Sequence, residues 1–234
     1  MPSRWELTIP DIDPTTIRLE HLHAVASAWL DQPGQHHTHS KPYTISPPSH
    51  SISGTVVEIG LLEDHLTHRL LNHTTHGTRI RLGRSTTTLA SPPQQVAVAP
   101  WTELAAPRTT SAWRLTFVTP LTFRRGNKFT PFPNPKAILG GLRANWQTHA
   151  PPELRQIHLD LTTDPVWVTD INGHNEIITV NNRTVSGFIG QLRIESDTNH
   201  TTTENIDRLL RLAPFSGCGA YTTRGFGLTR VEPA

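Results

Sequence analysis

Residues 217–227 run Gly217-Cys218-Gly219-Ala220-Tyr221-Thr222-Thr223-Arg224-Gly225-Phe226-Gly227 and precede a strand-like stretch, residues 228–231. Four glycines among these eleven residues allow this glycine loop to adopt positive φ and to approach a partner closely. Thr222, Thr223 and Arg224 add hydroxyl and guanidinium donors, which suit phosphate oxygens. The loop follows a helical pattern at 204–212, whereas a P-loop follows a strand and contains Gly-Lys-Ser/Thr. A glycine-rich turn of a β-rich domain is the alternative on these residues alone.

Three further blocks extend the pattern: LTFVTPLTFRRGNK at 115–128, KAILGGLRANW at 136–146 and VSGFIGQLRI at 185–194. Together with the glycine loop they resemble the RAMP superfamily, specifically the CRISPR endoribonucleases that cut precursor crRNA within its repeats. The resemblance covers residues 112–232. It implies a tandem pair of ferredoxin-like (RRM-like) domains in which the glycine loop packs beside RNA.

Hydrophobic periodicity along the chain predicts the same plan twice. The fold class is therefore α+β, with two tandem ferredoxin-like domains, residues 1–106 and 107–234, that contain antiparallel sheets. The boundary lies near Pro107, and Asn172-Gly173 predicts a hairpin turn within 166–180. The first unit is predicted to contain strands at 5–9, 54–62, 78–82 and 96–99 and helices at 15–30 and 63–71. The second is predicted to contain strands at 112–123, 156–162, 166–180, 185–195 and 226–232 and helices at 136–147 and 204–212.

Positive charge is concentrated in the second half of the chain. Residues 1–106 contain 7 Lys/Arg and 9 Asp/Glu, whereas residues 107–234 contain 14 and 10. This asymmetry is typical of a half that binds phosphates, although a solvated basic turn is the common alternative. The predicted RNA-binding residues are Arg124, Arg125, Lys128, Lys136, Arg143, Gly217, Gly219, Thr222, Arg224, Gly225 and Gly227.

The composition predicts a soluble globular protein of the cytoplasm. No apolar run approaches 18 residues, the N-terminal residues lack the apolar core of a signal peptide, and the single Cys218 cannot form an internal disulfide. Cys218 is expected to be a small filler of the glycine loop. We expect no membrane partner, and the chain to be a monomer or a homodimer.

The candidate catalytic residues lie directly after the first predicted helix, in the stretch QHHTHSKPYTIS at 35–46. Histidine, lysine and tyrosine suit metal-free RNA cleavage, in which the ribose 2′-OH attacks the adjacent phosphate. Imidazole titrates near neutrality and can therefore act as acid or base. The candidates are His36, His37, His39, Lys41 and Tyr43.

The resemblance extends to this segment, since the family often places a general acid/base histidine before a Lys-Pro-aromatic-Thr-x-Ser stretch, here residues 41–46. Spacing to Lys41 favours His36 or His37 over His39 and leaves the first two unresolved, with a slight preference for His37. A solvated histidine-rich loop and a metal site are the alternatives. His21 and His23 lie on the first predicted helix, where either could face the same cleft, although ordinary helix-surface histidines are expected. No resident metal or cofactor is predicted.

Two function classes follow from the resemblance. The first is an endoribonuclease that recognises the CRISPR repeat RNA and releases crRNA with a 2′,3′-cyclic phosphate and a 5′-OH. The second is a non-cleaving RAMP subunit that binds crRNA with other subunits of an effector complex. The grouping of histidine, lysine and tyrosine favours the endoribonuclease, because a binding subunit does not require it.

Overall fold

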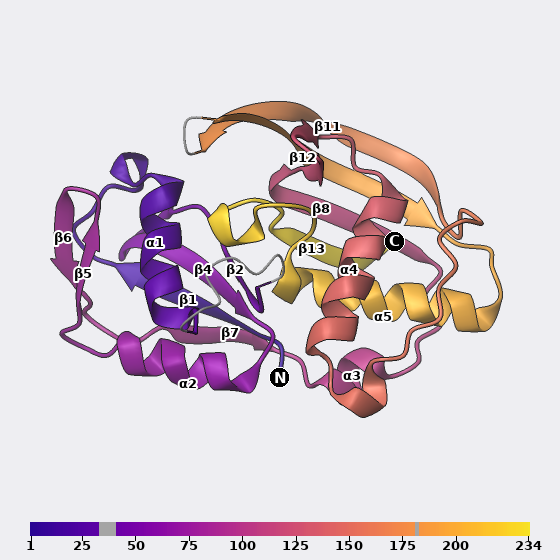
Figure 1. The fold of residues 1–234 in the computed structure, drawn as a ribbon, viewed down its shortest axis with the longest axis horizontal. Helices are drawn as coiled ribbons and strands as arrows, with labels where there is room; N and C mark the ends of the chain where they lie inside the picture. Colours follow the sequence, from indigo (N-terminus) through magenta and orange to yellow (C-terminus); the bar gives the residue numbers. More distant parts are fainter. Residues whose placement is uncertain (33–40, 181–182) are drawn as a thin grey trace.

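The computed structural model describes residues 1–32, 41–180 and 183–234. These residues form two α+β units side by side, and each unit packs two helices against one face of an antiparallel sheet (Figure 1). None of the helices in these described ranges is long and apolar enough to span a membrane.

In the described residues, the first unit has a five-stranded sheet in the order β2-β4-β1-β7, with β3 also paired to β4. Alternate residues of β1 are buried, as expected for a strand with one face on the core. A separate hairpin, β5–β6, lies beyond this sheet. The elements are β1 (Ser3–Ile9), α1 (Leu19–Leu30), β2 (Tyr43–Ile45), β3 (Ser49–Ser51), β4 (Gly54–Leu61), α2 (Asp64–His73), β5 (Arg79–Leu82), β6 (Ser85–Thr88) and β7 (Gln94–Val98).

The second unit repeats this arrangement, with a four-stranded sheet in the order β11-β12-β8-β13. A short helix, α3 (Trp101–Ala105), links the two units. The remaining elements are β8 (Ala112–Leu121), β9 (Phe123–Arg125), β10 (Lys128–Thr130), α4 (Pro135–His149), β11 (Trp167–Val180), β12 (Arg183–Glu195), α5 (His200–Ser216) and β13 (Thr229–Pro233). Three 3-10 turns lie at Pro14–Thr16, Pro152–Leu154 and Thr222–Arg224.

In both sheets the first strand of the unit lies between the strand that precedes the second helix and the last strand. β1 lies between β4 and β7, and β8 lies between β12 and β13, all paired antiparallel. This is the strand order of the ferredoxin-like fold. The prediction of two tandem ferredoxin-like units with antiparallel sheets is confirmed.

The predicted turn at Asn172-Gly173 is wrong, because β11 continues through both residues. Gly173 lies opposite Gly190 of β12, and the pairing continues to Val180 opposite Arg183. A Cβ on Gly173 would lie 2.2 Å from the Ile189 carbonyl oxygen and 2.6 Å from the Phe188 ring. Glycine therefore serves close packing within one long hairpin and does not form a turn there.

The predicted strand at 156–162 is also wrong. Ile157 and Leu159 are buried in the core of the second unit, but the segment has no strand partner among the described residues. Asp160 instead accepts hydrogen bonds from the backbone and side chain of Thr162, at 2.8 and 2.7 Å, which forms a local turn. The alternating apolar residues Ile157, Leu159 and Leu161 gave the segment the pattern of a strand.

The two units are held together by packing and by charge. The Trp101 ring lies edge-on to the Trp146 ring, with 5.2 Å between centroids, so that α3 packs into the core of the second unit. Arg230 of β13 donates to both carboxylate oxygens of Glu58 on β4, at 2.5 and 2.7 Å. His149, in the last turn of α4, lies 2.6 Å from Glu63 next to α2. These contacts fix the walls of the site described next.

Candidate active site between the two units

The glycine loop lies between the two units, beside α1, where the yellow segment in the middle of Figure 1 shows it. All four of its glycines have positive φ, as predicted. A Cβ on Gly227 would lie 1.8 Å from the Cys218 carbonyl oxygen, and one on Gly219 would lie 2.4 Å from the Thr122 oxygen. The space that a Cβ would fill at these two residues is therefore occupied by the protein's own backbone, and only glycine fits there.

Side chains within the loop fix its conformation further. Tyr221 adopts φ 63° and its ring stacks on Phe129 of β10, with 5.2 Å between centroids. The Arg224 guanidinium lies 5.3 Å from the centre of the same ring. Cys218 is buried, and burial raises the pKa of its thiol to about 12, as expected for an inert filler. The loop therefore presents Arg224 from a rigid aromatic support.

A cleft of about 690 Å³ separates the glycine loop from β9 and the first half of α4. It brings together several of the predicted residues, which come from both units and are far apart in the sequence. Three arginines give it a strongly positive lining, which suits a phosphate backbone. The lining residues are His23, Lys41, Phe123, Arg124, Arg125, Ala137, Gly141, Gly219, Ala220, Tyr221, Thr222, Thr223 and Arg224.

The other predicted RNA-binding residues lie outside this lining. Lys128 is exposed on β10, across the turn from Arg125, and Gly217, Gly225 and Gly227 are buried within the glycine loop. Lys136 and Arg143 do not join the cleft. The ammonium of Lys136 pairs with Asp164 at 2.9 Å, and Arg143 donates to the Leu159 carbonyl oxygen at 2.6 Å. Both side chains bind residues 159–164, so RNA contact by either one stays a prediction.

Lys41 belongs to a polar network at the end of α1. Its ammonium forms an ion pair with Asp31, and the Tyr43 hydroxyl donates to the other Asp31 oxygen at 2.8 Å. The Ser27 hydroxyl lies 3.1 Å from the same Tyr43 oxygen. The network holds the Lys41 ammonium at the wall of the cleft.

The structure changes the interpretation of Tyr43. The residue is 1% exposed and does not line the cleft, and burial, together with the hydrogen bond to Asp31, raises the pKa of its phenol. A phenol with a raised pKa does not lose its proton near neutral pH. Tyr43 therefore supports Asp31 through its hydrogen bond, and a part for it in proton transfer stays a prediction.

His23 lines the cleft, whereas the sequence predicted an ordinary residue on the surface of the first helix. Its Nδ1 lies 2.9 Å from the Thr223 carbonyl oxygen, which can only accept, so Nδ1 donates and the lone pair lies on Nε2. Burial and the positive charge of Arg224 lower its pKa. The helical spacing contained the signal, because Leu19, His23 and Ser27 follow one another at i,i+4 along one side of α1.

His36, His37 and His39 lie outside the described residues. The described residues next to them are Gln32, which follows α1, and Lys41 in the cleft wall.

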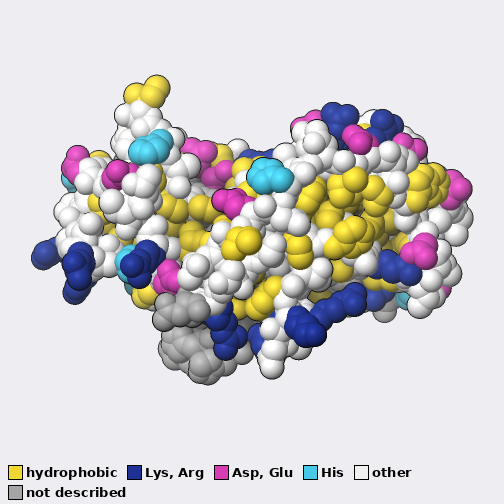
Figure 2. All heavy atoms as spheres, turned by 90° about the horizontal axis from the view of Figure 1, so that it is seen from above, with side chains coloured by type: hydrophobic (Ala, Val, Ile, Leu, Met, Phe, Trp, Pro, Cys, Tyr) yellow, Lys and Arg dark blue, Asp and Glu magenta, His cyan; other side chains and the backbone are white. Residues whose placement is uncertain are grey.

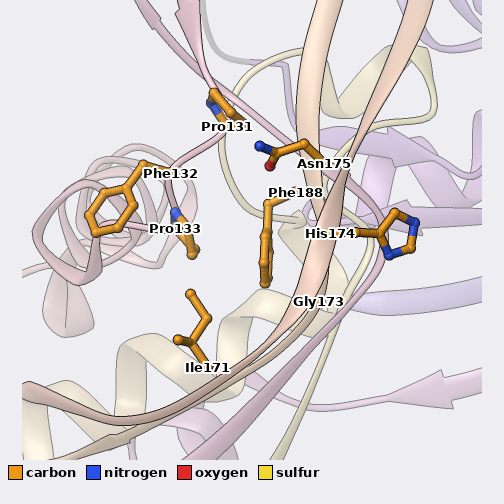
Figure 3. A pocket seen from close by; sticks show the side chains of 8 residues that line it. All are labelled: Pro131, Phe132, Pro133, Ile171, Gly173, His174, Asn175 and Phe188. Carbon is orange, nitrogen blue, oxygen red and sulfur yellow. The ribbon is translucent and has the colours of Figure 1, made fainter.

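Two smaller hollows continue from the cleft toward the β11–β12 hairpin. The first, of about 290 Å³, shares Phe123, Arg125 and Ala137 with the cleft. The second, of about 300 Å³, adjoins the first through Phe132, and in Figure 3 the Asn175 side chain points into it while His174 points away. From above, hydrophobic side chains cover much of this end of the molecule, and Lys and Arg lie along its lower edge and at its upper right edge (Figure 2).

Comparison with known proteins supports the family resemblance seen in the sequence. The model of the family described as CRISPR-associated endoribonuclease Cas6 matches residues 115–229. No curated protein sequence matches the chain. The family match confirms the resemblance seen in the sequence.

Solved structures match the chain over nearly its whole length. A Cas6 product complex is 24% identical, with 99% of each chain covered and a TM-score of 0.81. Cas6 of Thermus thermophilus is 25% identical, with 99% of this chain and 98% of that chain covered and a TM-score of 0.67. A structure described as a RAMP protein binding different RNA substrates is 13% identical, with 99% of each chain covered and a TM-score of 0.58. Residues 115–229 therefore match the family of CRISPR-associated Cas6 endoribonucleases, and the fold of the whole chain is similar to that of solved Cas6 structures.

Proposed function

We propose that this chain cuts CRISPR repeat RNA in the cleft between its two units, without a metal ion, and so processes precursor crRNA. One observation carries the proposal: the cleft brings a histidine, His23, and a lysine, Lys41, together with Arg124, Arg125 and Arg224. The arginines suit the phosphates on either side of a scissile bond. Histidine and lysine supply the proton transfer and the charge that cleavage requires.

The reaction that this arrangement supports is attack by the ribose 2′-OH on its own 3′ phosphate. A new bond forms between the 2′-oxygen and phosphorus, and the bond from phosphorus to the 5′-oxygen of the next nucleotide breaks. A base removes the 2′-OH proton and an acid protonates the departing 5′-oxygen. The products are a 2′,3′-cyclic phosphate and a 5′-OH.

His23 has the features of the base in this scheme. The hydrogen bond from Nδ1 to the Thr223 oxygen fixes the ring and leaves the lone pair on Nε2. The lowered pKa keeps the imidazole neutral, and therefore able to accept a proton, near neutral pH. Thr223 belongs to the glycine loop, so the loop orients the base as well as carrying Arg224.

Lys41 is assigned to charge stabilisation. Its ion pair with Asp31, which is supported by Tyr43, holds the ammonium in place before RNA arrives. A preorganised cation stabilises the extra negative charge that phosphorus carries in the transition state. The acid is assigned to His37 or His36, following the resemblance of residues 41–46 to the family's motif.

The test is single-turnover cleavage, in EDTA, of repeat RNA from the CRISPR array of the same genome. We expect the wild type to cut, His23→Ala to slow cutting by about 10²–10⁴-fold, and Lys41→Ala to slow it by about a hundredfold. The triple variant His36→Ala, His37→Ala, His39→Ala is expected to lose activity as His23→Ala does. His200→Ala serves as the matched control, because His200 is exposed at the start of α5, outside the cleft.

RNA affinity separates the possible outcomes, since loss of a proton-transfer group need not weaken ground-state binding. Loss of cutting in EDTA with recovery in Mg²⁺ would contradict the metal-free mechanism. Tight binding by the wild type without any cutting would identify a non-cleaving RAMP subunit instead.

A further inference from the structure

The β5–β6 hairpin carries a second basic surface, outside the cleft. No Asp or Glu occurs from residue 65 to residue 102, although the chain contains 19 acidic residues. The hairpin lies within this acid-free stretch. It holds three of the seven Lys/Arg residues of positions 1–106, namely Arg79, Arg81 and Arg84. The excess of acidic residues in the first half of the chain therefore hides a local cluster of positive charge.

Burial along the hairpin directs these arginines outward. Ile80 and Leu82 are 4% and 3% exposed and pack in the core of the first unit. Arg79 and Arg81 alternate with them along β5 and therefore face solvent. Arg84 is exposed at the turn. Arg81 donates to the Gly83 carbonyl oxygen at 3.0 Å, and Thr87 of β6 donates to Pro10 at 3.0 Å. The hairpin is therefore anchored on one side and presents guanidinium groups on the other.

Among the described residues, none of these three arginines forms an ion pair with a carboxylate. Exposed hydroxyl groups lie beside them, since Thr86 and Thr88 are exposed on the neighbouring strand. Guanidinium groups without a carboxylate partner, beside hydroxyl donors, are suited to phosphate oxygens. This chemistry favours a polyanion as the ligand of the hairpin.

A groove joins the hairpin to α1. A hollow of about 410 Å³ lies between them, and a second of about 430 Å³ lies on the hairpin itself. The α1 wall of the groove contains the small exposed side chains of Ala24 and Ala28, which project little from the helix. The first hollow is lined by His21, Ala24, Val25, Ala28, Trp29, Arg79, Ile80, Arg81 and Gly83, and the second by Arg79, Ile80, Arg81, Arg84 and Thr86.

Helix α1 separates this groove from the cleft. Leu19 and His23 on one side meet the glycine loop, at Gly225 and Thr223. His21, on another side, meets the hairpin at Gly83. Figure 1 shows α1 between the hairpin and the loop, and Figure 2 shows Lys and Arg both at the hairpin end and near the middle of the molecule. The groove and the cleft thus lie on two sides of α1, and an α-helix with its side chains is about 10–12 Å across.

We propose that the β5–β6 hairpin is a second binding site for the RNA backbone. RNA that is cut in the cleft passes over the low surface of α1, and its phosphates bind Arg79, Arg81 and Arg84. This inference rests on the proposed function, because it assumes that RNA occupies the cleft. RNA is favoured over an acidic protein as the ligand. The groove and the cleft are separated only by α1, so one RNA chain could bind the basic residues of both.

The test compares two double variants that remove the same charge. Arg79→Ala/Arg84→Ala changes the hairpin and keeps Arg81, which holds the turn. Arg108→Ala/Arg114→Ala is the control, since both arginines are exposed and line neither the cleft nor the groove. Affinity for the repeat RNA is measured across a salt titration. The single-turnover cleavage rate is measured at saturating protein, and circular dichroism verifies that each variant is folded.

Log affinity falls with log salt, and each lost phosphate contact decreases the steepness of this fall by about 0.7–0.9. We expect the hairpin variant to lower the slope by about 1–2 and the control to leave it unchanged. The cleavage rate at saturation should stay within about twofold of wild type, since the hairpin does not touch the cleft. Equal slopes and affinities for the two variants would overturn the inference, as would a loss of rate without a loss of affinity.

The experiment keeps this inference apart from the proposed function. If the wild type binds the repeat RNA and never cuts it, the proposed catalysis fails, while the comparison of slopes still decides the role of the hairpin. If the wild type does not bind the RNA, both fail.

Discussion

Single residues determine the chemistry of the cleft, and His23 illustrates how. The ring belongs to the first unit, but the Thr223 carbonyl oxygen of the second unit selects its tautomer. Burial and Arg224 of the second unit lower its pKa. Lys41 is held in the same way by Asp31 and Tyr43, which do not line the cleft. His23 and Lys41 thus each depend on neighbouring residues for their position in the cleft.

The lowered pKa of His23 predicts the pH dependence of cleavage. A base must be neutral, and the pKa of His23 lies below its ordinary value of 6.5. The single-turnover rate should therefore rise with pH in the acidic range and level off at or below about pH 6.5. A pH–rate profile of the wild type measures this, and His23→Ala should lose the acidic limb. A wild-type rate that falls as pH rises through this range would contradict the assignment of His23 as base.

At the scale of elements, the glycine loop depends on its own backbone contacts. Gly227→Ala would place a methyl group 1.8 Å from the Cys218 oxygen at φ 68°. Gly126→Ala, in the β9–β10 turn, has a similar φ of 61° but no atom within 4 Å of the added carbon. Both variants carry the left-handed backbone cost of about 1–2 kcal/mol, and only Gly227→Ala adds the clash.

We therefore expect Gly227→Ala to lower the free energy of unfolding clearly more than Gly126→Ala does, and also to weaken RNA binding. Urea denaturation and RNA titration measure the two effects. Equal losses of stability would show that the backbone contact of Gly227 is not the constraint.

Local sequence predicted most elements but not all of their ends or partners. Hydrophobic spacing found both helices of each unit, and the glycine loop identified the last helix–loop–strand segment. Asn172-Gly173 misled because turn propensity is local, whereas β12 offers a partner along the whole of β11. The segment at 156–162 misled because Ile157 and Leu159 are buried without pairing. In both segments, tertiary contacts decided the outcome.

The site was predicted less completely than the fold, for the same reason. Lys41, Arg124 and Arg224 were identified by residue type, and they line one cleft. Residue type cannot show that Tyr43 is buried or that Lys136 binds Asp164. The place of His23 in the cleft could not be predicted, because its hydrogen bond to Thr223 joins residues that lie 200 positions apart in the sequence.

At the scale of the whole molecule, the cleft exists because the two units are docked in one arrangement. Glu58 lies between Arg230 and Arg4, which come from different units. Burial, followed by the charge of Arg230, lowers the pKa of Arg4, so the two guanidinium groups repel and Glu58 balances them. Removal of Glu58 would leave two partly buried cations facing each other.

Glu58→Gln should therefore destabilise the protein by about 1.5–3 kcal/mol, the range for hydrogen bonds to charged groups. Glu58→Gln/Arg230→Gln should be less destabilised than the sum of the two single variants, because it removes the repulsion as well. Chemical denaturation of the three variants measures the coupling. Additive losses would show that this ion pair does not hold the units together.

The central claim is that the ribose 2′-OH of the RNA is the nucleophile, activated in the cleft by protein side chains. A repeat RNA with a single 2′-deoxy nucleotide at the cleavage position tests it most directly, in EDTA, beside the unmodified RNA. We expect the deoxy RNA to bind with about the same affinity and not to be cut there, while the unmodified RNA yields a 2′,3′-cyclic phosphate. Cutting of the deoxy RNA at the same position and rate would contradict the account.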